Sequence, residues 1–190
     1  MVRLPEPTDF RLLTDTGGNI YSSRGPQILI PILNSFVVNT ASSWGTKFFD
    51  LEYAMSGDFE LSWVPGVTSH FRYFGVSYPP LATRDASYSS SFDFSLYMQT
   101  GGALQVYELG VNTATIAGGY DATGRLMIKR VGTTITVLRA GVLKHTSGTT
   151  FTTADMQGSA HLNSNGAEIN DVQVDGVDAS LNNSAGGVLS

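Results

Sequence analysis

The pattern of hydrophobic and polar positions becomes regular at about residue 48. Large apolar side chains occupy every second position of residues 48–55, and the same spacing returns in residues 59–63 after a Ser-Gly-Asp turn. A period of two places successive side chains on opposite faces of a β-strand. We therefore expect two antiparallel strands here, with Leu61 and Trp63 on the buried face.

Similar segments recur along the rest of the chain, separated by turns that contain glycine, proline or asparagine. They predict strands at residues 71–77, 92–98, 103–109, 125–131, 134–139, 142–145 and 167–174. Residues 152–157 predict one helical turn with Thr152 or Thr153 as its N-cap. No segment shows a 3.6-residue apolar stripe over three turns. The expected fold class is therefore all-β, an antiparallel β-sandwich of the jelly-roll kind.

Residues 1–45 follow a different pattern, because prolines interrupt them repeatedly. Proline cannot donate to a β-ladder, so we expect an extended N-terminal arm with one or two short strands. The apolar part of this arm could pack on a neighbouring subunit or form an ordinary edge strand of the sandwich. Its candidate assembly residues are Pro26, Ile28, Ile30, Pro31, Ile32 and Leu33. The expected organisation is the arm (1–45), the sandwich (46–178) and a Gly/Ser/Asn-rich tail (179–190).

Charge and hydropathy exclude two classes of partner. Only 14% of the residues are charged, the net charge is −5, and the 11 lysines and arginines are scattered along the chain. A nucleic-acid partner requires a basic patch that neutralises phosphates, so none is expected. No apolar run approaches the length of about 18 residues that a membrane-spanning helix needs, so membrane insertion is not expected.

The chain contains no cysteine, which excludes disulfides, thiolate metal sites and a cysteine nucleophile. Its first residues also lack the apolar core of a signal peptide. Both features favour synthesis in a reducing compartment.

Carboxylates and histidines are the residues to test for catalysis. Two pairs of acids are spaced to share one strand face, namely Asp50 with Glu52 and Asp58 with Glu60. A glycosidase needs two carboxylates about 5–10 Å apart, but alternation places both pairs on the solvent-facing side. The three histidines lack metal-ligand spacing, and we expect loop or strand-end positions for His70, His145 and His161. No catalytic residue is therefore predicted.

Three acids near the C-terminus, Asp171, Asp175 and Asp178, raise the question of Ca²⁺, which loop carboxylates can bind. Their spacing is not that of an EF-hand loop, so solvated acids are the default interpretation. We expect no cofactor and no metal, with Ca²⁺ the one ion left open.

Aromatic residues at loop or polar positions are the best candidates for binding a ligand. Tyrosine and tryptophan rings tolerate half-burial and stack on sugar rings. The candidate glycan-binding residues are Trp44, Tyr78, Tyr88, Tyr97, Tyr107 and Tyr120. For each of them the alternative is that the ring only covers the edge of the core.

The order of strands and turns over residues 46–175 resembles the concanavalin A-like, laminin-G-like jelly roll. The segments that carry the resemblance are Gly57-Asp-Phe-Glu-Leu-Ser-Trp, Tyr73-Phe-Gly-Val-Ser, Tyr120-Asp-Ala-Thr-Gly-Arg-Leu-Met-Ile-Lys-Arg-Val-Gly-Thr-Thr-Ile, Gly141-Val-Leu and Gly166-Ala-Glu-Ile-Asn-Asp-Val. They form a pattern of strands and turns without a catalytic signature. The acidic cluster of the concanavalin-like glucanases is absent.

The resemblance implies a carbohydrate-binding module, an adhesion domain, or a tail, fibre or capsid-decorating protein of a bacteriophage. The missing cysteine and signal peptide fit the phage context best. We therefore expect a non-enzymatic structural protein of a virion, assembled in the host cytoplasm and exposed on the particle surface. Its expected partners are other virion proteins bound through the arm, further copies in a homo-oligomer (a trimer is favoured) and a cell-surface glycan. The alternatives are a free lectin or carbohydrate-binding module and a polysaccharide-degrading enzyme.

Overall fold

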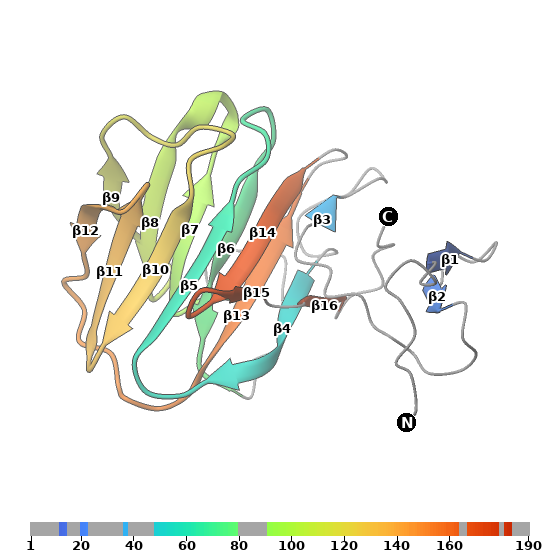
Figure 1. Ribbon diagram of the computed structural model, residues 1–190. Coiled ribbons are helices and arrows are strands. Elements are labelled where there is room, and N and C mark those ends of the chain that lie inside the picture. Colours follow the sequence, from blue (N-terminus) through green and yellow to red (C-terminus); the bar gives the residue numbers. More distant parts are fainter. Residues whose placement is uncertain are drawn as a thin grey trace. The chain divides into compact units, whose positions relative to one another are not determined.

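The computed structural model describes residues 12–14, 20–22, 36–37, 48–79, 91–163, 167–178 and 181–183. The chain divides into two compact units, residues 1–32 and 33–190. In the first unit, β1 (Leu12–Thr14) pairs antiparallel with β2 (Ile20–Ser22). The second unit contains two antiparallel sheets that pack face to face (Figure 1).

The first sheet has the strand order β12-β11-β10-β5-β14-β15, and β3 also pairs with β14. Its strands are β12 (Val142–Thr146), β11 (Thr134–Arg139), β10 (Leu126–Val131), β5 (Phe59–Val64), β14 (Glu168–Val174), β15 (Val177–Asp178) and β3 (Phe36–Val37). In the view of Figure 1 this sheet is the nearer one.

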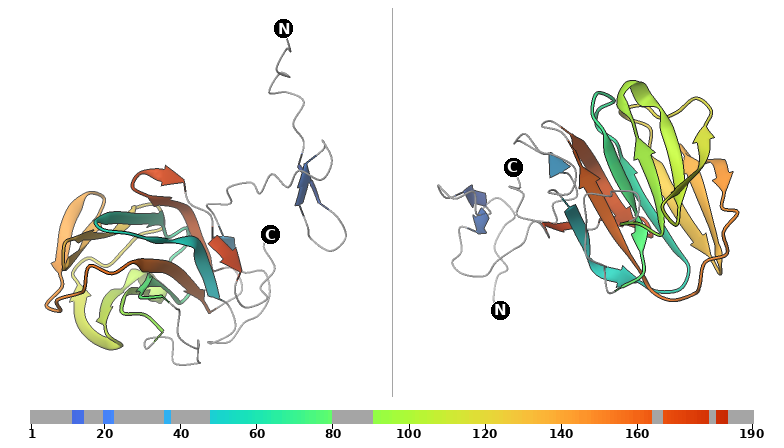
Figure 2. Two further views of the ribbon diagram at one scale, coloured as in Figure 1. Left: turned by 90° about the horizontal axis from the view of Figure 1, so that it is seen from below. Right: turned by 180° about the vertical axis from the view of Figure 1, so that it is seen from behind.

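The second sheet has the order β16-β4-β13-β6-β7-β8-β9. Its strands are β16 (Leu181–Asn183), β4 (Phe48–Met55), β13 (Met156–Leu162), β6 (Arg72–Ser77), β7 (Phe94–Met98), β8 (Leu104–Glu108) and β9 (Val111–Ile116). The right-hand view of Figure 2 shows this sheet from behind, with β6 to β9 in front.

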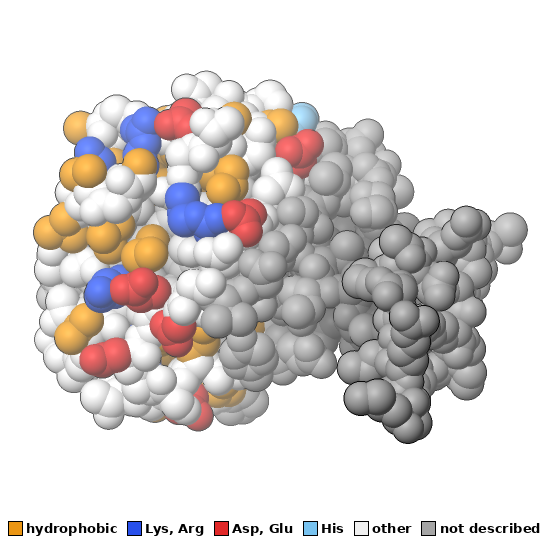
Figure 3. All heavy atoms as spheres, viewed as in Figure 1, with side chains coloured by type: hydrophobic (Ala, Val, Ile, Leu, Met, Phe, Trp, Pro, Cys, Tyr) orange, Lys and Arg blue, Asp and Glu red, His pale blue; other side chains and the backbone are white. Residues whose placement is uncertain are grey.

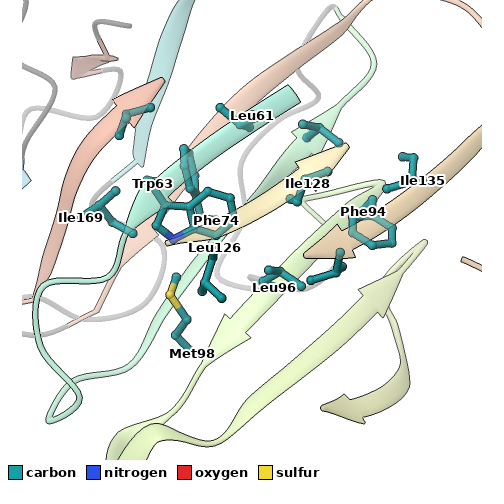
Figure 4. Packing of buried hydrophobic residues seen from close by; sticks show 14 of the residues in the cluster. Leu61, Trp63, Phe74, Phe94, Leu96, Met98, Leu126, Ile128, Ile135 and Ile169 are labelled. Atoms are coloured by element: carbon teal, nitrogen blue, oxygen red, sulfur yellow. The ribbon is translucent and has the colours of Figure 1, made fainter. Parts of the chain in front are cut away.

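The core lies between the two sheets and follows the alternation of the sequence. Trp63 of β5 is fully buried and meets Phe74 of β6 edge to face, with 4.3 Å between ring centroids. Figure 4 shows that the surrounding aliphatic side chains come from both sheets. Burying one such side chain contributes about 1.5–3 kcal/mol, so this layer is the main stabilising element of the fold.

Two arginines are buried within this apolar interior. The guanidinium of Arg130 donates to the carbonyls of Gly57 and Ala154 and lies 4.8 Å from the ring centroid of Phe59. A buried charge is tolerated when it is hydrogen-bonded and faces an aromatic ring. Arg130 therefore fixes the β4–β5 turn against the loop that precedes β13.

A second buried arginine, Arg72, donates to the carbonyl of Val67 and to the Tyr120 hydroxyl. Burial lowers the pKa of Arg72, and the neighbouring Tyr120 opposes that shift. The interaction joins β6 to two loops of the sandwich.

A buried carboxylate, that of Glu108, links the two sheets at the β8–β12 edge. Its donors are Thr113 Oγ1 (3.1 Å), His145 Nε2 (2.9 Å), Ser147 Oγ (2.7 Å) and Thr149 N (3.0 Å). Alternation directs Glu108 inward with Leu104 and Val106, and these four donors compensate its loss of water.

Most predicted strands are confirmed within one or two residues of their ends. The helical turn predicted over residues 152–157 is wrong, because β13 begins at Met156 and a loop precedes it. Contacts with distant residues replace helical bonds in this loop: the Tyr78 hydroxyl accepts from Thr152 N (2.7 Å), and Arg130 donates to Ala154 O. The short strands β9, β15 and β16 were not predicted either.

Candidate functional site

Three tyrosines from adjacent strands lie on the outer face of the second sheet. Tyr73 of β6 is directly opposite Tyr97 of β7, and Tyr107 of β8 is opposite Ser95. Their strand neighbours point into the core, so alternation directs all three rings away from it. The structure thus places Tyr97 and Tyr107, two of the candidate glycan-binding residues, close together.

The three rings are packed against one another. Tyr73 and Tyr97 are stacked, with 4.3 Å between centroids and 6° between planes. Tyr107 meets Tyr73 edge to face at 5.5 Å and Tyr97 at 6.1 Å. Tyr73 is fully buried, whereas Tyr97 and Tyr107 are partly exposed. Tyr73 therefore holds the other two rings in place, and these two present the surface.

Amide side chains border the exposed rings. Gln99 Nε2 donates to Gln105 Oε1 (3.0 Å), and the Tyr107 hydroxyl is 3.5 Å from the same oxygen. Asn112 of β9 is opposite Tyr107 and exposed. We define the aromatic face as Tyr97, Tyr107, Gln99, Gln105 and Asn112. Rings beside amides are the usual composition of sites that bind uncharged polar ligands.

Gly75 and Ser95 provide space next to the aromatic face. A Cβ on Gly75 would lie 2.3 Å from the carbonyl oxygen of Phe94 and 2.5 Å from Ser95 Cβ, so no larger residue fits there. Because these two residues are small, the rings of Tyr73 and Tyr107 can approach each other across β7. Two further aromatics flank the group: Phe71 beside Tyr97 at 6.0 Å and Phe92 beside Tyr73 at 6.1 Å.

The expectation that Tyr120 lies on the surface is corrected by the structure. Tyr120 is only 4% exposed, its hydroxyl donates to the carbonyl of Gln99 (2.8 Å), and it also accepts from Arg72. Buried polar atoms close by satisfy its hydroxyl, and the ring packs into the core. Tyr120 therefore offers no ring surface to a ligand.

Tyr78 is partly exposed, but its hydroxyl accepts from Thr152 N and its ring packs against the core. It does not join the aromatic face. Trp44, Tyr88 and the assembly residues of the arm, Pro26 to Leu33, lie outside the described residues.

The acids considered for catalysis have structural partners. Asp50 is buried and accepts from Ser159 Oγ, which corrects its expected solvent-facing position. The adjacent strand β13 supplies this hydroxyl, because Ser159 is directly opposite Asp50. Asp58 accepts from Gly132 N (2.7 Å), and Glu60 from Lys129 (2.6 Å). The side chain of Glu52 is not among those described.

The histidines are also held by the fold. His161 is fully buried and is the residue before the last one of β13, as expected for a strand-end position. His145 lies in β12 and bonds to Glu108, and His70 lies in the loop before β6. Within the described ranges, no group of three His, Cys, Asp or Glu residues could hold a metal ion.

The acids near the C-terminus, considered above for Ca²⁺, have other partners. Asp171 forms an ion pair with Arg125, and Asp175 Oδ1 accepts from Glu60 N (2.8 Å). The side chain of Asp178 is not described.

The outer face of the first sheet has a different chemistry. Figure 3 shows that its basic and acidic side chains lie next to one another, as in the Lys129–Glu60 and Arg125–Asp171 pairs. Glu60 raises the pKa of Lys129. An open depression of about 310 Å³ borders the Lys129–Glu60 pair. Lys129 and Glu60 already pair with each other there, so this face is less suited to a ligand than the aromatic face.

Neither a protein-family model nor a curated protein matches the sequence. Solved structures do match the fold. The Emp46p carbohydrate recognition domain in its metal-free form is 11% identical, with a TM-score of 0.54, covering 76% of this chain and 83% of that one. The SPRY domain of human HERC1 is 15% identical, with a TM-score of 0.52, covering 73% and 93%.

The chain has a jelly-roll sandwich fold. This result confirms the fold class predicted from the sequence. At these identities the likeness concerns the fold, and the site must be argued from the residues of this chain. Within the part that the structure describes, no helix is long and apolar enough to cross a membrane.

Proposed function

We propose that this protein is a non-enzymatic, glycan-binding structural subunit of a bacteriophage particle. One observation carries the glycan-binding part: Tyr97 and Tyr107 lie together, partly exposed and bordered by Gln99 and Gln105, on the outer face of one sheet. The apolar faces of a sugar ring stack on aromatic rings, and its hydroxyls bond to amides.

The aromatic face is preorganised for this role. Stacking on the buried Tyr73 fixes Tyr97, and the hydrogen bond from Gln99 fixes the amide of Gln105. Groups that are already ordered lose less conformational entropy on binding. The face contains no charged side chain, so we propose a neutral glycan as its ligand. A shallow site of this size predicts a dissociation constant of about 1 mM to 1 μM, which suits display in many copies.

The non-enzymatic part rests on the acids. Glu60, Asp58, Asp121, Asp171 and Glu108 each bond to a partner within the fold. None of them belongs to the aromatic face. A sugar bound there would therefore lie against rings and amides, and the pair of carboxylates that most glycosidases use would be missing from the site.

The virion part of the proposal rests on the sequence. The chain has no cysteine, and proline interrupts the apolar arm over residues 1–45. We propose that this arm binds other virion proteins and that the jelly roll is displayed on the particle surface. A free lectin with the same aromatic face is the alternative, and it gives the arm no function.

The glycan-binding proposal is tested on an array of bacterial surface polysaccharides and their oligosaccharide fragments. We expect the full-length chain to bind a subset of neutral glycans and to leave their reducing ends unchanged after prolonged incubation. Absence of binding across the array contradicts glycan recognition. Release of new reducing ends contradicts the non-enzymatic assignment.

The virion proposal is tested by removing residues 1–32, which leaves β3 paired with β14. In host cells that produce particles, we expect the tagged full-length chain to be incorporated and the truncated chain to fold but remain outside. Far-ultraviolet circular dichroism and a thermal melt check the folding. Equal incorporation of both chains would show that the arm is not the anchor.

A further inference from the structure

The strand β9 forms the end of the second sheet, and no described strand pairs with its outer side. Alternate residues of such an edge direct unpaired backbone N–H and C=O groups outward. Two large hydrophobic residues at its start are well exposed: Leu109 by 59% and Val111 by 63%. The edge therefore presents both unpaired backbone groups and apolar surface.

Leu109 also has an unfavourable backbone conformation. It forms the β8–β9 turn with Gly110, and both residues have positive φ, 50° for Leu109 and 80° for Gly110. Asparagine, aspartate and glycine are the residues that adopt this region readily, whereas for leucine it is strained. An exposed leucine at such a position is unfavourable in two respects within a single chain, and burial against another chain would remove the exposure.

We propose that β9 pairs antiparallel with β9 of a second copy of this chain. An antiparallel edge is self-complementary about a two-fold axis, so one contact satisfies the outward backbone groups of both copies. The six residues of β9 carry no charge, so pairing of two copies removes no charged side chain of β9 from water. Leu109 and Val111 of each copy then lose contact with water.

The other edge strand nearby is not suited to the same pairing. Lys144 is the middle residue of β12, so full antiparallel overlap would place it opposite the Lys144 of the copy. A lysine on an edge is a common protection against association. Both edge ladders contain one register shift, between Val137 and Leu138 for β12 and between Val106 and Tyr107 for β9, so the difference between the two edges lies in the lysine. This contrast selects β9 as the interface.

The pairing would join the second sheets of two copies into one continuous sheet. Asn112 and Thr115, both exposed on β9, continue the aromatic face toward the edge. Two aromatic faces would then lie on one surface and could engage a polysaccharide together. This consequence rests on the proposed glycan function, whereas the pairing itself does not.

Light scattering on the full-length chain across a concentration series tests the pairing. The variants are Val111→Lys and, as a matched control, Val131→Lys, since Val131 is 54% exposed at the far end of β10. We expect Val111→Lys to raise the dissociation constant of the pair at least tenfold and to halve the mass relative to Val131→Lys. The twofold ratio between the masses of the two variants is expected even where the arm forms a larger oligomer.

A second variant, Leu109→Asn, separates association from folding. Asparagine tolerates the positive φ of residue 109, so the melting temperature should stay equal or rise while association weakens. A wild-type mass of 20.3 kDa at every concentration overturns the proposal. Equal masses for Val111→Lys and Val131→Lys overturn it as well.

Discussion

Substitution of Glu108 by glutamine is expected to lower the free energy of unfolding at neutral pH by about 3 kcal/mol. Glu108 is only 3% exposed, and its oxygens accept from four donors that come from both sheets and the β12–β13 loop. A glutamine has one acceptor oxygen, and its amide would face groups that are donors. The substitution therefore leaves buried polar atoms without partners.

The same substitution should remove the part of the acid pH dependence of stability that Glu108 contributes. Burial alone would raise the pKa of Glu108, but hydrogen bonds from Thr149, His145 and Ser147 lower it from 4.5 to about 2. A carboxyl whose pKa is lowered on folding stabilises the protein above its unfolded pKa. That contribution is lost as the pH falls from about 4.5 to about 2.

Urea unfolding of the wild type and Glu108→Gln between pH 7 and pH 2 provides the measurement. The two curves should differ by about 3 kcal/mol at pH 7 and converge near pH 2. Asp121, whose pKa is also lowered to about 2, chiefly by Arg139, is present in both proteins and cancels in the difference. Glu60→Gln is the control, because its ion pair with Lys129 is partly exposed and should contribute less than about 1 kcal/mol. If the free energies of unfolding of the wild type and Glu108→Gln differed by the same amount at every pH, the lowered pKa of Glu108 would not be the source of the pH dependence.

Replacement of Tyr97 by alanine is expected to weaken glycan binding at least tenfold, which corresponds to about 1.4 kcal/mol. Alanine removes one of the two exposed rings and also exposes part of Tyr73, which stacks on Tyr97. Tyr107→Ala should have an effect of similar size. Tyr97→Phe keeps the ring and should bind within about threefold of the wild type, because stacking needs the π-face and not the hydroxyl.

Calorimetric titration with a glycan identified on the array measures these affinities. Tyr78→Ala is the matched control, since Tyr78 is also a partly exposed tyrosine but lies outside the aromatic face. A thermal melt of each variant verifies that it is folded at the temperature of the titration. Equal losses for Tyr97→Ala and Tyr78→Ala would show that binding depends on general stability and not on the aromatic face.

The sequence predicts strands well where one face is buried and the other polar. β8 and β10 alternate in burial and were predicted closely. β13 was missed because nearly all of its residues are buried. Small residues such as Gly158 and Ser159 stand in it, and large apolar side chains do not occupy every second position. A strand buried on both faces has no period of two to detect.

The aromatic face was predictable only in part. Tyr97 and Tyr107 stand at polar-face positions of recognisable strands, and this signal is sufficient to propose them. Their contact with Tyr73 depends on the register between β6 and β7, which the sequence does not specify. Tyr120 has the same local signal as an exposed loop tyrosine, and its burial arises from distant partners, Arg72 and Gln99.

The central claim is that the outer face of β6 to β9 binds a glycan through Tyr97 and Tyr107. The most direct test is amide chemical-shift mapping by NMR of the full-length chain during titration with an oligosaccharide identified on the array. The account predicts saturable shifts confined to β7, β8, β9 and Gln99, with Tyr97 and Tyr107 among the largest. Shifts centred on the first sheet or on the loops at the ends of the sandwich would contradict it.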